Sequence, residues 1–296
     1  MLWGIDLGGT KIEGAILDEK DDMRVLIRER IPTEGAEGYD HVVLQIAKLV
    51  KQMETQTGLR PDKIGIGTPG SLDPILNTLK NCNTTALNGK PLKSDLEATL
   101  GIPVAIANDA NCFAVAEANM GIVKEVMPEA EVVFGVIMGS GVGGGIVVNG
   151  KVLNGRQGIA GEWGHNLLDE NGPRCYCGKV GCVETIISGP SLERYYESLT
   201  GNFMKLREIT ASVETDKAAA QTVDRLINYF GKAIANIVNI LDPDAIVLGG
   251  GVGNIDVLYT DGVEAARPYV FNNRFDTVFL KPKLGDSAGV FGAAFL

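Results

Sequence analysis

A chain of 296 residues that is 45% hydrophobic and 22% charged can bury a large core, which excludes a disordered protein. Its net charge of -10 excludes the basic surface needed to bind a nucleic-acid backbone, and no apolar run reaches the length of a membrane span. The length favours two domains. Because the chain enters a strand pattern at Leu2 with no basic segment before it, we expect a cytoplasmic protein without nucleic-acid or membrane partners.

In the first part of the chain, short apolar runs typical of β-strands alternate with a helical pattern. Apolar residues at helical spacing from Val42 to Met53 predict a helix that ends before Gly58. The predicted strands lie at residues 2–6, 12–17, 64–67 and 104–107. This alternation predicts an α/β fold.

A second series of elements repeats the opening of the first. Residues 132–138 and 146–148 read as strands on either side of a glycine cluster, and Asn149-Gly150 is typical of a hairpin turn. Apolar positions between Val223 and Leu241 then predict a long helix, followed by a buried strand at 245–248. The repeat predicts an internal duplication, with ligands bound between two similar halves.

Three glycine clusters, each after a predicted strand, favour phosphate binding, because glycine lets backbone N–H groups approach an anion closely. Any one of them could be an ordinary tight turn. The second matches the dinucleotide pattern GxGxxG, but β-branched residues rather than a helix follow it, which disfavours dinucleotide binding. The clusters are Gly8-Gly9-Thr10, Gly139 to Gly145, and Gly249-Gly250-Gly251.

Asn108 and Asp109 follow a predicted strand and precede a helical run over residues 110–119. Either residue could simply cap that helix. Asp109 could instead be the general base that takes the proton of a hydroxyl attacking the γ-phosphate of ATP. The spacing alone leaves both interpretations open.

A histidine and three cysteines have the composition of a closed zinc site. Three thiolates and one imidazole satisfy tetrahedral zinc and leave no open catalytic position. The alternative is a set of reduced cysteines in a glycine-rich loop. The total of five cysteines is odd, which disfavours a disulfide framework. The four candidate ligands are His165, Cys175, Cys177 and Cys182.

Seven motifs occur in the order typical of the ROK family of repressors and sugar kinases, and the chain resembles that family over nearly its whole length. The resemblance implies a two-lobed, actin/hexokinase-like (ribonuclease H-like) fold with duplicated βαβ halves and a cleft between them. It implies a small lobe of residues 1–118 plus 286–296, a large lobe of 119–285 with the zinc-binding loop, and a homodimer. The motifs are Asp6-Leu-Gly-Gly-Thr-Lys, Gly67-Thr-Pro-Gly70, Asn108-Asp-Ala-Asn111, the second glycine cluster, Gly161-Glu-Trp-Gly-His165, Cys175-Tyr-Cys-Gly-Lys-Val-Gly-Cys182 and Leu248-Gly-Gly-Gly251.

The resemblance also implies a role for each matching residue. Asp109 is the catalytic base, and Asp6 lies near magnesium. Structural zinc is bound by the four candidate ligands, and the second ring nitrogen of His165 contacts the sugar. The residues implied for the sugar are Gly70, Asn83, Asn108, Asp109, Glu162, His165 and Glu184. Those implied for ATP and its magnesium are Asp6, Gly8, Gly9, Thr10, Lys11, Gly139, Ser140, Gly141, Gly143, Gly144, Gly249, Gly250 and Gly251.

Within the family, residues 81–89, Trp163 and the Cys-Tyr-Cys-Gly run resemble the fructokinase/mannokinase branch. We therefore expect ATP-dependent phosphorylation of a hexose at its 6-hydroxyl, fructose first and mannose next. N-acetylated sugars are expected to be poor substrates, because no sequence feature indicates a space for the acetyl group.

Alternatives to this expectation come from the same family and from other classes. Within the family they are a glucokinase and an N-acetylhexosamine kinase. A non-catalytic sugar sensor would not need Asp6 and Asp109, and a chaperone-like ATPase would leave the cysteine loop without a purpose. A ROK repressor would carry an additional DNA-binding domain before the first strand.

Overall fold

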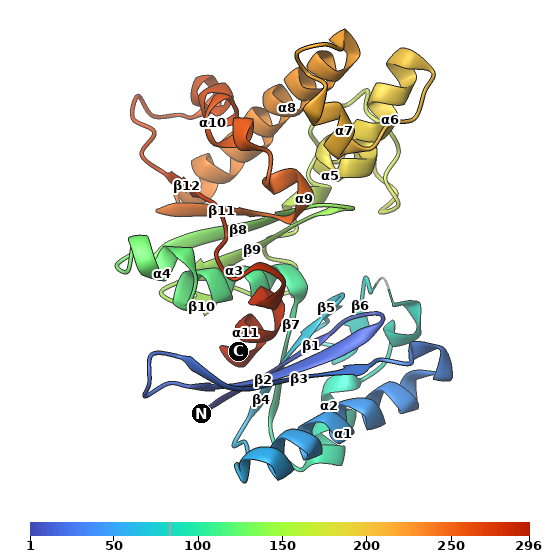
Figure 1. Ribbon diagram of the computed structural model, residues 1–296, viewed down its shortest axis with the longest axis vertical. Coiled ribbons are helices and arrows are strands. Elements are labelled where there is room, and N and C mark those ends of the chain that lie inside the picture. Colours follow the sequence, from blue (N-terminus) through green and yellow to red (C-terminus); the bar gives the residue numbers. More distant parts are fainter. Residues whose placement is uncertain (83) are drawn as a thin grey trace. The chain divides into compact units, whose positions relative to one another are not determined.

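The computed structural model describes residues 1–82 and 84–296, which form two compact units (Figure 1). The first unit comprises Met1–Pro128, Gly145–Ala160 and Lys283–Leu296, and the second comprises Glu129–Gly144 and Gly161–Pro282. These boundaries differ from the expected ones mainly in residues 145–160. They join the first unit because Gly145 packs tightly on its backbone: an added Cβ would lie 2.6 Å from the carbonyl oxygen of Ala110.

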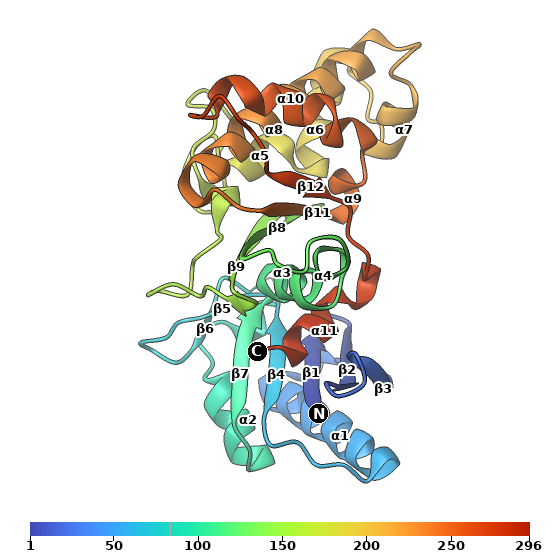
Figure 2. The same cartoon turned by 90° about the vertical axis from the view of Figure 1, so that its left-hand side faces the viewer.

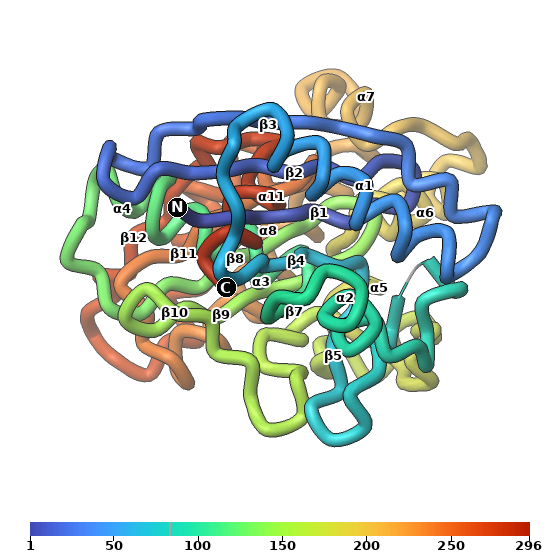
Figure 3. Tube along the Cα trace, turned by 90° about the horizontal axis from the view of Figure 1, so that it is seen from below, coloured from blue at the N-terminus to red at the C-terminus, as the bar shows by residue number. Residues whose placement is uncertain are grey.

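The first unit is built on a five-stranded sheet of order β3-β2-β1-β4-β7 (Figure 3). β1, β2 and β3 pair antiparallel, whereas β4 and β7 join β1 in parallel. A two-stranded hairpin, β5 and β6, follows β4. The strands are β1 (Leu2–Leu7), β2 (Lys11–Asp18), β3 (Arg24–Pro32), β4 (Ile64–Thr68), β5 (Ser71–Leu72), β6 (Leu79–Lys80) and β7 (Val104–Asn108).

The first unit's long helix forms where the apolar spacing predicts it. Helix α1 buries Ile46, Leu49 and Met53, and it ends at Gly58, whose φ of 69° suits glycine. Helix α11 packs on β1 and β4 (Figure 2) because Gly4 and Gly65 carry no side chain there. The helices are α1 (Tyr39–Thr57), α2 (Leu92–Leu100), α3 (Asp109–Asn119), α4 (Ile122–Val126) and α11 (Ala288–Ala294).

The second five-stranded sheet, of order β10-β9-β8-β11-β12, repeats the topology of the first. β8 is its central strand, with the β9–β10 hairpin on one side and parallel β11 and β12 on the other. Asn149 and Gly150 turn the hairpin with φ of 50° and 74°, as predicted. The strands are β8 (Val132–Met138), β9 (Val142–Val148), β10 (Lys151–Val152), β11 (Ala245–Gly249) and β12 (Val278–Leu280). The shared strand order confirms the predicted duplication and the α/β class.

Helix α8 is the long amphipathic helix that the sequence predicts. The Asp216 side chain caps its first turn, the apolar stripe is buried, and Asp242 ends it in a left-handed conformation before Pro243. The helices of this part of the chain are α5 (Val183–Ile187), α6 (Gly189–Thr200), α7 (Leu206–Ala211), α8 (Lys217–Leu241), α9 (Gly250–Gly253) and α10 (Asp261–Ala266). No helix in the described ranges 1–82 and 84–296 is long and apolar enough to cross a membrane.

Candidate active site

The first glycine turn, Gly8-Gly9-Thr10, joins β1 to β2 and is held by a buried threonine. The Gly8 N–H donates to the Lys11 carbonyl at 3.0 Å. Thr33 donates its hydroxyl to the Gly8 carbonyl at 2.7 Å and its N–H to the Thr10 carbonyl at 3.0 Å. Thr33 is 1% exposed, and no sequence pattern singled it out. The turn therefore has a fixed shape without any bound phosphate.

Asp6, on β1 just before this turn, is a partly buried carboxyl group. Burial, and then the charges of Asp109 and Glu13, raise its pKa from 3.8 to about 6, with Lys11 and Arg30 opposing. Helix α11 comes close to it: a Cβ on Gly289 would lie 2.9 Å from Asp6 Oδ2. Ionised Asp6 is thus destabilised by its surroundings, and a bound cation would relieve that cost.

Lys11 lies half exposed beside a buried acidic side chain. Its Nζ is 4.0 Å from Glu13 Oε2, and Glu13 is 1% exposed. Arg28 and Arg30 on β3 pair with the same carboxylate. Burial raises the pKa of Glu13, but the hydrogen bonds from the two arginines outweigh it, so the pKa is lowered. The structure therefore surrounds one buried carboxylate with three cationic side chains beside the first glycine turn. Only Lys11 of this group was identified from the sequence.

The capping question at α3 is resolved by its first hydrogen bonds. Asn108 Oδ1 accepts from the Asn111 N–H at 2.8 Å, so Asn108 is the N-cap. Asp109 lies in the first turn, where its Oδ1 accepts from the Ala110 N–H at 2.8 Å. The Asp109 side chain is exposed, but the protein around it displaces water and so raises its pKa. The hydrogen bond from the Ala110 N–H lowers the pKa and offsets part of this effect. Asp109 is therefore available for chemistry rather than used as the cap.

The loop formed by the second glycine cluster is shorter than the sequence predicts. The turn is confined to Gly139-Ser140-Gly141, and Gly143 and Gly144 lie within β9. A Cβ on Gly144 would lie 2.7 Å from the rings of Phe134 and Trp163, so glycine is required there for packing. The predicted strand began only at residue 146, because glycine has a low intrinsic preference for strands.

Two side chains hold this turn in place. Trp163 donates its indole N–H to the Gly143 carbonyl at 2.9 Å, and Glu184 Oε2 accepts from the Val142 N–H at 2.9 Å. Glu184 fits because Gly141 has no side chain: an added Cβ would lie 2.6 Å from its Oε2. Trp163 and Glu184 therefore fix the start of β9, directly after the glycine turn.

A cavity of about 1050 Å³ opens beside this turn in the second unit. Its walls combine Gly139, Ser140 and Gly251 with side chains from α6, α7 and the segment after α9. Gly250 serves packing instead: its φ is 81°, and an added Cβ would lie 2.3 Å from the Met138 carbonyl oxygen. The lining residues that no motif indicated include Pro190, Glu193, Lys205, Arg207, Thr210, Asn254 and Asp256.

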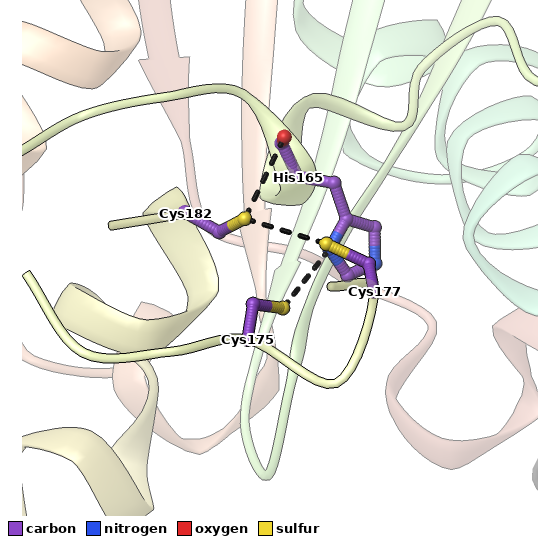
Figure 4. A group of neighbouring side chains, drawn as sticks. All are labelled: His165, Cys175, Cys177 and Cys182. Atoms are coloured by element: carbon purple, nitrogen blue, oxygen red, sulfur yellow. Dashed lines mark hydrogen bonds between the residues drawn. The ribbon is translucent and has the colours of Figure 1, made fainter. Parts of the chain in front are cut away.

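The four candidate zinc ligands come together in the second unit (Figure 4). His165 Nδ1 lies 3.6 Å from Cys175 Sγ, and the Sγ atoms of Cys177 and Cys182 are 3.6 Å apart. All four ligand atoms lie within 4.8 Å of one another. Bond lengths of a tetrahedral zinc site set sulfur–sulfur separations of about 3.8 Å and sulfur–nitrogen separations of about 3.6 Å. The cluster therefore has the size that zinc requires.

The other nitrogen of His165 faces a residue that the sequence analysis did not identify. His165 Nε2 lies 3.0 Å from the hydroxyl of Tyr176, and the two rings meet edge to face. Burial, followed by the charges of Glu184, Cys175 and Glu162, raises the pKa of Tyr176 to about 12. The Tyr176 hydroxyl therefore occupies the hydrogen-bonding position that the family resemblance gives to a sugar.

Gly70, a further residue expected to contact the sugar, directly precedes β5. A Cβ on Gly70 would lie 2.4 Å from Cys82 Sγ, so hairpin packing already explains this glycine. Asn83 lies outside the described residues.

A protein-family model described as the ROK family matches residues 2–296. The chain belongs to the ROK family. This ROK chain is 39% identical to the N-acetyl-D-glucosamine kinase of Vibrio atlanticus (strain LGP32), with 100% of this chain and 99% of the relative aligned.

Solved structures of ROK proteins support the assignment of this chain to the family. The ROK hexokinase from Thermus thermophilus superposes with a TM-score of 0.89 at 34% identity, covering 99% of this chain and 96% of that one. A ROK glucokinase from Streptomyces griseus, solved in complex with glucose and AMPPNP, has a TM-score of 0.74 at 28% identity, covering 99% and 97%. The fold is therefore the actin/hexokinase-like one, and this ROK chain is a sugar kinase. The expected fructose preference finds no support among these relatives.

Proposed function

We propose that this chain transfers the γ-phosphate of ATP to the 6-hydroxyl of N-acetylglucosamine. The observation that carries the proposal is the 39% identity to an N-acetyl-D-glucosamine kinase along the full length of both chains. N-acetylglucosamine replaces fructose as the proposed substrate. The expectation of fructose rested on the resemblance of residues 81–89 and two other motifs to one branch of the family. The N-acetylhexosamine alternative becomes the main hypothesis, and fructose and mannose become comparison substrates.

Asp109 is the proposed catalytic base. Its raised pKa makes it a stronger base than an ordinary carboxylate, and Asn108 supplies the helix cap in its place. Asp109 takes the proton of the 6-hydroxyl as that oxygen bonds to the γ-phosphorus, and the bond from the γ-phosphorus to the bridging oxygen breaks to release ADP. Positioning of the hydroxyl supplies much of the rate in such a reaction.

Asp6 is the proposed magnesium-side carboxylate. Burial, and then the charge of Asp109, raise its pKa, and a bound divalent cation would offset both effects. The residues present therefore fit a hard divalent cation held through oxygen ligands. Magnesium, when bound, neutralises charge on the ATP phosphates. Asp6 would hold the cation, directly or through water.

The nucleotide would occupy the cavity beside Gly139 and Gly251. A volume of about 1050 Å³ is at the upper end of what small-molecule sites require. The N–H groups of the Gly139-Ser140-Gly141 turn would face the phosphates. Gly8 to Thr10 and Lys11 are the phosphate contacts proposed for the first unit. Of the third cluster, Gly251 has nothing within 4 Å of an added Cβ, so it leaves room for the adenosine.

A structural zinc ion would be held by His165, Cys175, Cys177 and Cys182, whose separations fit it. Zinc would fix the ring of His165, because Nδ1 faces the sulfur atoms. Nε2 lies against the Tyr176 hydroxyl, so a sugar hydroxyl would replace Tyr176 there. The remaining proposed sugar contacts are Gly70, Asn83, Asn108, Glu162 and Glu184. The homodimer and the cytoplasmic location stay predictions.

The decisive experiment measures ADP release with N-acetylglucosamine, N-acetylmannosamine, glucose, fructose and mannose at several concentrations each. We expect the highest kcat/KM with N-acetylglucosamine, and phosphate on O6 of the product by NMR. A higher kcat/KM with glucose would make the chain a glucokinase, and no sugar-dependent ADP release would leave the sensor hypothesis.

A further inference from the structure

A small cavity in the first unit lies beside the proposed sugar contacts. Its volume is about 110 Å³, and three separate segments form its walls: β5 with the residues after it, the end of β7 with the start of α3, and the loop after β10. Asn108 is itself one wall, and Ser71 follows Gly70 directly. A sugar held by Asn108 and Gly70 would therefore have this cavity next to it.

One wall of the cavity is formed by a buried amide side chain, Asn111. Asn111 is 6% exposed, and its Oδ1 has no hydrogen-bond partner among residues 1–82 and 84–296. The residue lines the cavity one turn into α3. An unpaired buried acceptor destabilises a protein, so such groups are usually paired with a ligand or water. Solvent does not reach Oδ1, so the Asn111 side chain would have to rotate to present this acceptor to a donor in the cavity.

The remaining walls are partly apolar and partly polar. Leu72, Pro74 and Ile106 supply carbon atoms, while Ser71 and Asn154 supply polar ones. An acetamido group has the matching chemistry, because it carries a methyl group, one N–H donor and one carbonyl acceptor. A hydroxyl group has no carbon to place against Leu72 or Ile106.

The volume also selects an acetyl-sized group. One water occupies about 30 Å³ of liquid, so the cavity of about 110 Å³ has room for three to four atoms of that size. An acetyl group has three non-hydrogen atoms. A whole hexose has twelve and cannot enter, and a single hydroxyl would leave most of the space empty.

We propose that this cavity is the N-acetyl subsite of the enzyme. The acetamido group at carbon 2 of the sugar enters it, the Asn111 side chain rotates to bring Oδ1 to the acetamido N–H, and the methyl group packs against Leu72 and Ile106. This inference rests on the proposed function, and it makes Asn111 and Ser71 specificity-determining residues. No single stretch of the sequence indicates the space, because residues from three distant segments form it.

Two variants test the subsite through selectivity, measured as the ratio of kcat/KM for N-acetylglucosamine to kcat/KM for glucose. Ser71→Val narrows the cavity, and Asn111→Leu removes the acceptor. Each should lower the ratio by about tenfold or more, the usual effect of misfitting one small group in a pocket. Asn119→Leu, at the other end of α3, and Ser94→Val, outside the cavity, are the matched controls and should leave the ratio within about twofold.

The ratio separates this proposal from a general loss of stability, because a damaged fold lowers turnover of both sugars together. If the wild type prefers N-acetylglucosamine and Ser71→Val leaves the ratio unchanged in folded protein, the subsite is wrong and the proposed function stands. If Asn111→Leu does not fold, Ser71→Val decides alone. A wild type that prefers an unmodified hexose overturns the proposed function and this subsite with it.

Discussion

The Glu184 carboxylate accepts a hydrogen bond of 2.9 Å from the backbone N–H of Val142. Glu184 lies in α5, two residues after the zinc-ligand candidate Cys182, and Val142 begins β9 immediately after the glycine turn. A residue expected to bind sugar is therefore bonded to the strand residue that directly follows the turn expected to bind phosphate. This contact would couple the two proposed binding functions within the second unit.

Glu184→Ala should raise KM for both substrates, because the turn loses its support and the sugar loses a contact. We expect about tenfold or more for each, the scale of a lost hydrogen bond to a charged group. Glu184→Gln retains an acceptor for Val142, so KM for ATP should stay within about threefold of wild type while KM for the sugar rises. Glu197→Ala, an exposed position on α6, is the control. Equal KM for ATP in wild type and Glu184→Ala would refute the coupling.

Asp109→Asn should lower kcat by about 100-fold or more, the scale of lost general-base catalysis, with a smaller change in sugar affinity. The amide keeps the shape of the side chain but cannot take the proton. Steady-state kinetics with sugar binding measured separately by calorimetry would check both parts. Asp40→Asn, on the exposed surface of α1, is the matched control. A variant that kept more than half of the wild-type kcat would show that another group is the base.

Asp6→Asn should stabilise the protein without magnesium as the pH rises. The folded-state pKa of Asp6 is about 6, above its ordinary value of 3.8. Protonated Asp6 is therefore favoured by folding, and this stability, fully present below about pH 4, is lost as the pH rises through about 6. The Asp6→Asn variant does not lose this stability, which amounts to at most about 3 kcal/mol in the free energy of unfolding.

Urea unfolding of wild type and Asp6→Asn at pH 4, 5, 6, 7 and 8 would measure this difference. It should grow between pH 4 and 7 and then stay constant. Asp62→Asn, an exposed carboxylate of the same unit, should show no such trend. A constant difference across the whole range would mean that Asp6 is not perturbed in the folded protein.

Purified protein should contain about one zinc per chain, as a closed four-ligand site requires. Cys177→Ser should lose the metal, lower the melting temperature and raise KM for the sugar, because the ring of His165 is no longer fixed. Cys82→Ser removes a thiol outside the cluster and should retain the zinc. Elemental analysis and thermal melting provide the readouts. Fully active, zinc-free protein prepared without chelators would contradict this prediction.

Local patterns in the sequence were sufficient to predict most of the secondary structure. The strands at 2–6, 64–67 and 132–138 and the helix that ends before Gly58 follow from apolar spacing and glycine stops, which act over a few residues. Three of the four candidate zinc ligands are also close in the chain, so their spacing carried the signal. The family's motif order supplied the two-lobed fold.

What the tertiary structure decided depends on residues that are far apart in the chain. The choice between Asn108 and Asp109 as helix cap needed backbone geometry, because both side chains can cap a helix. β9 extends through its glycines because pairing and the packing of Trp163 outweigh a poor local preference for strand. The cavity beside Asn111 exists only where three segments meet. The sequence by itself therefore determined the elements and the chemical groups, whereas the cavities beside them arise only from tertiary packing.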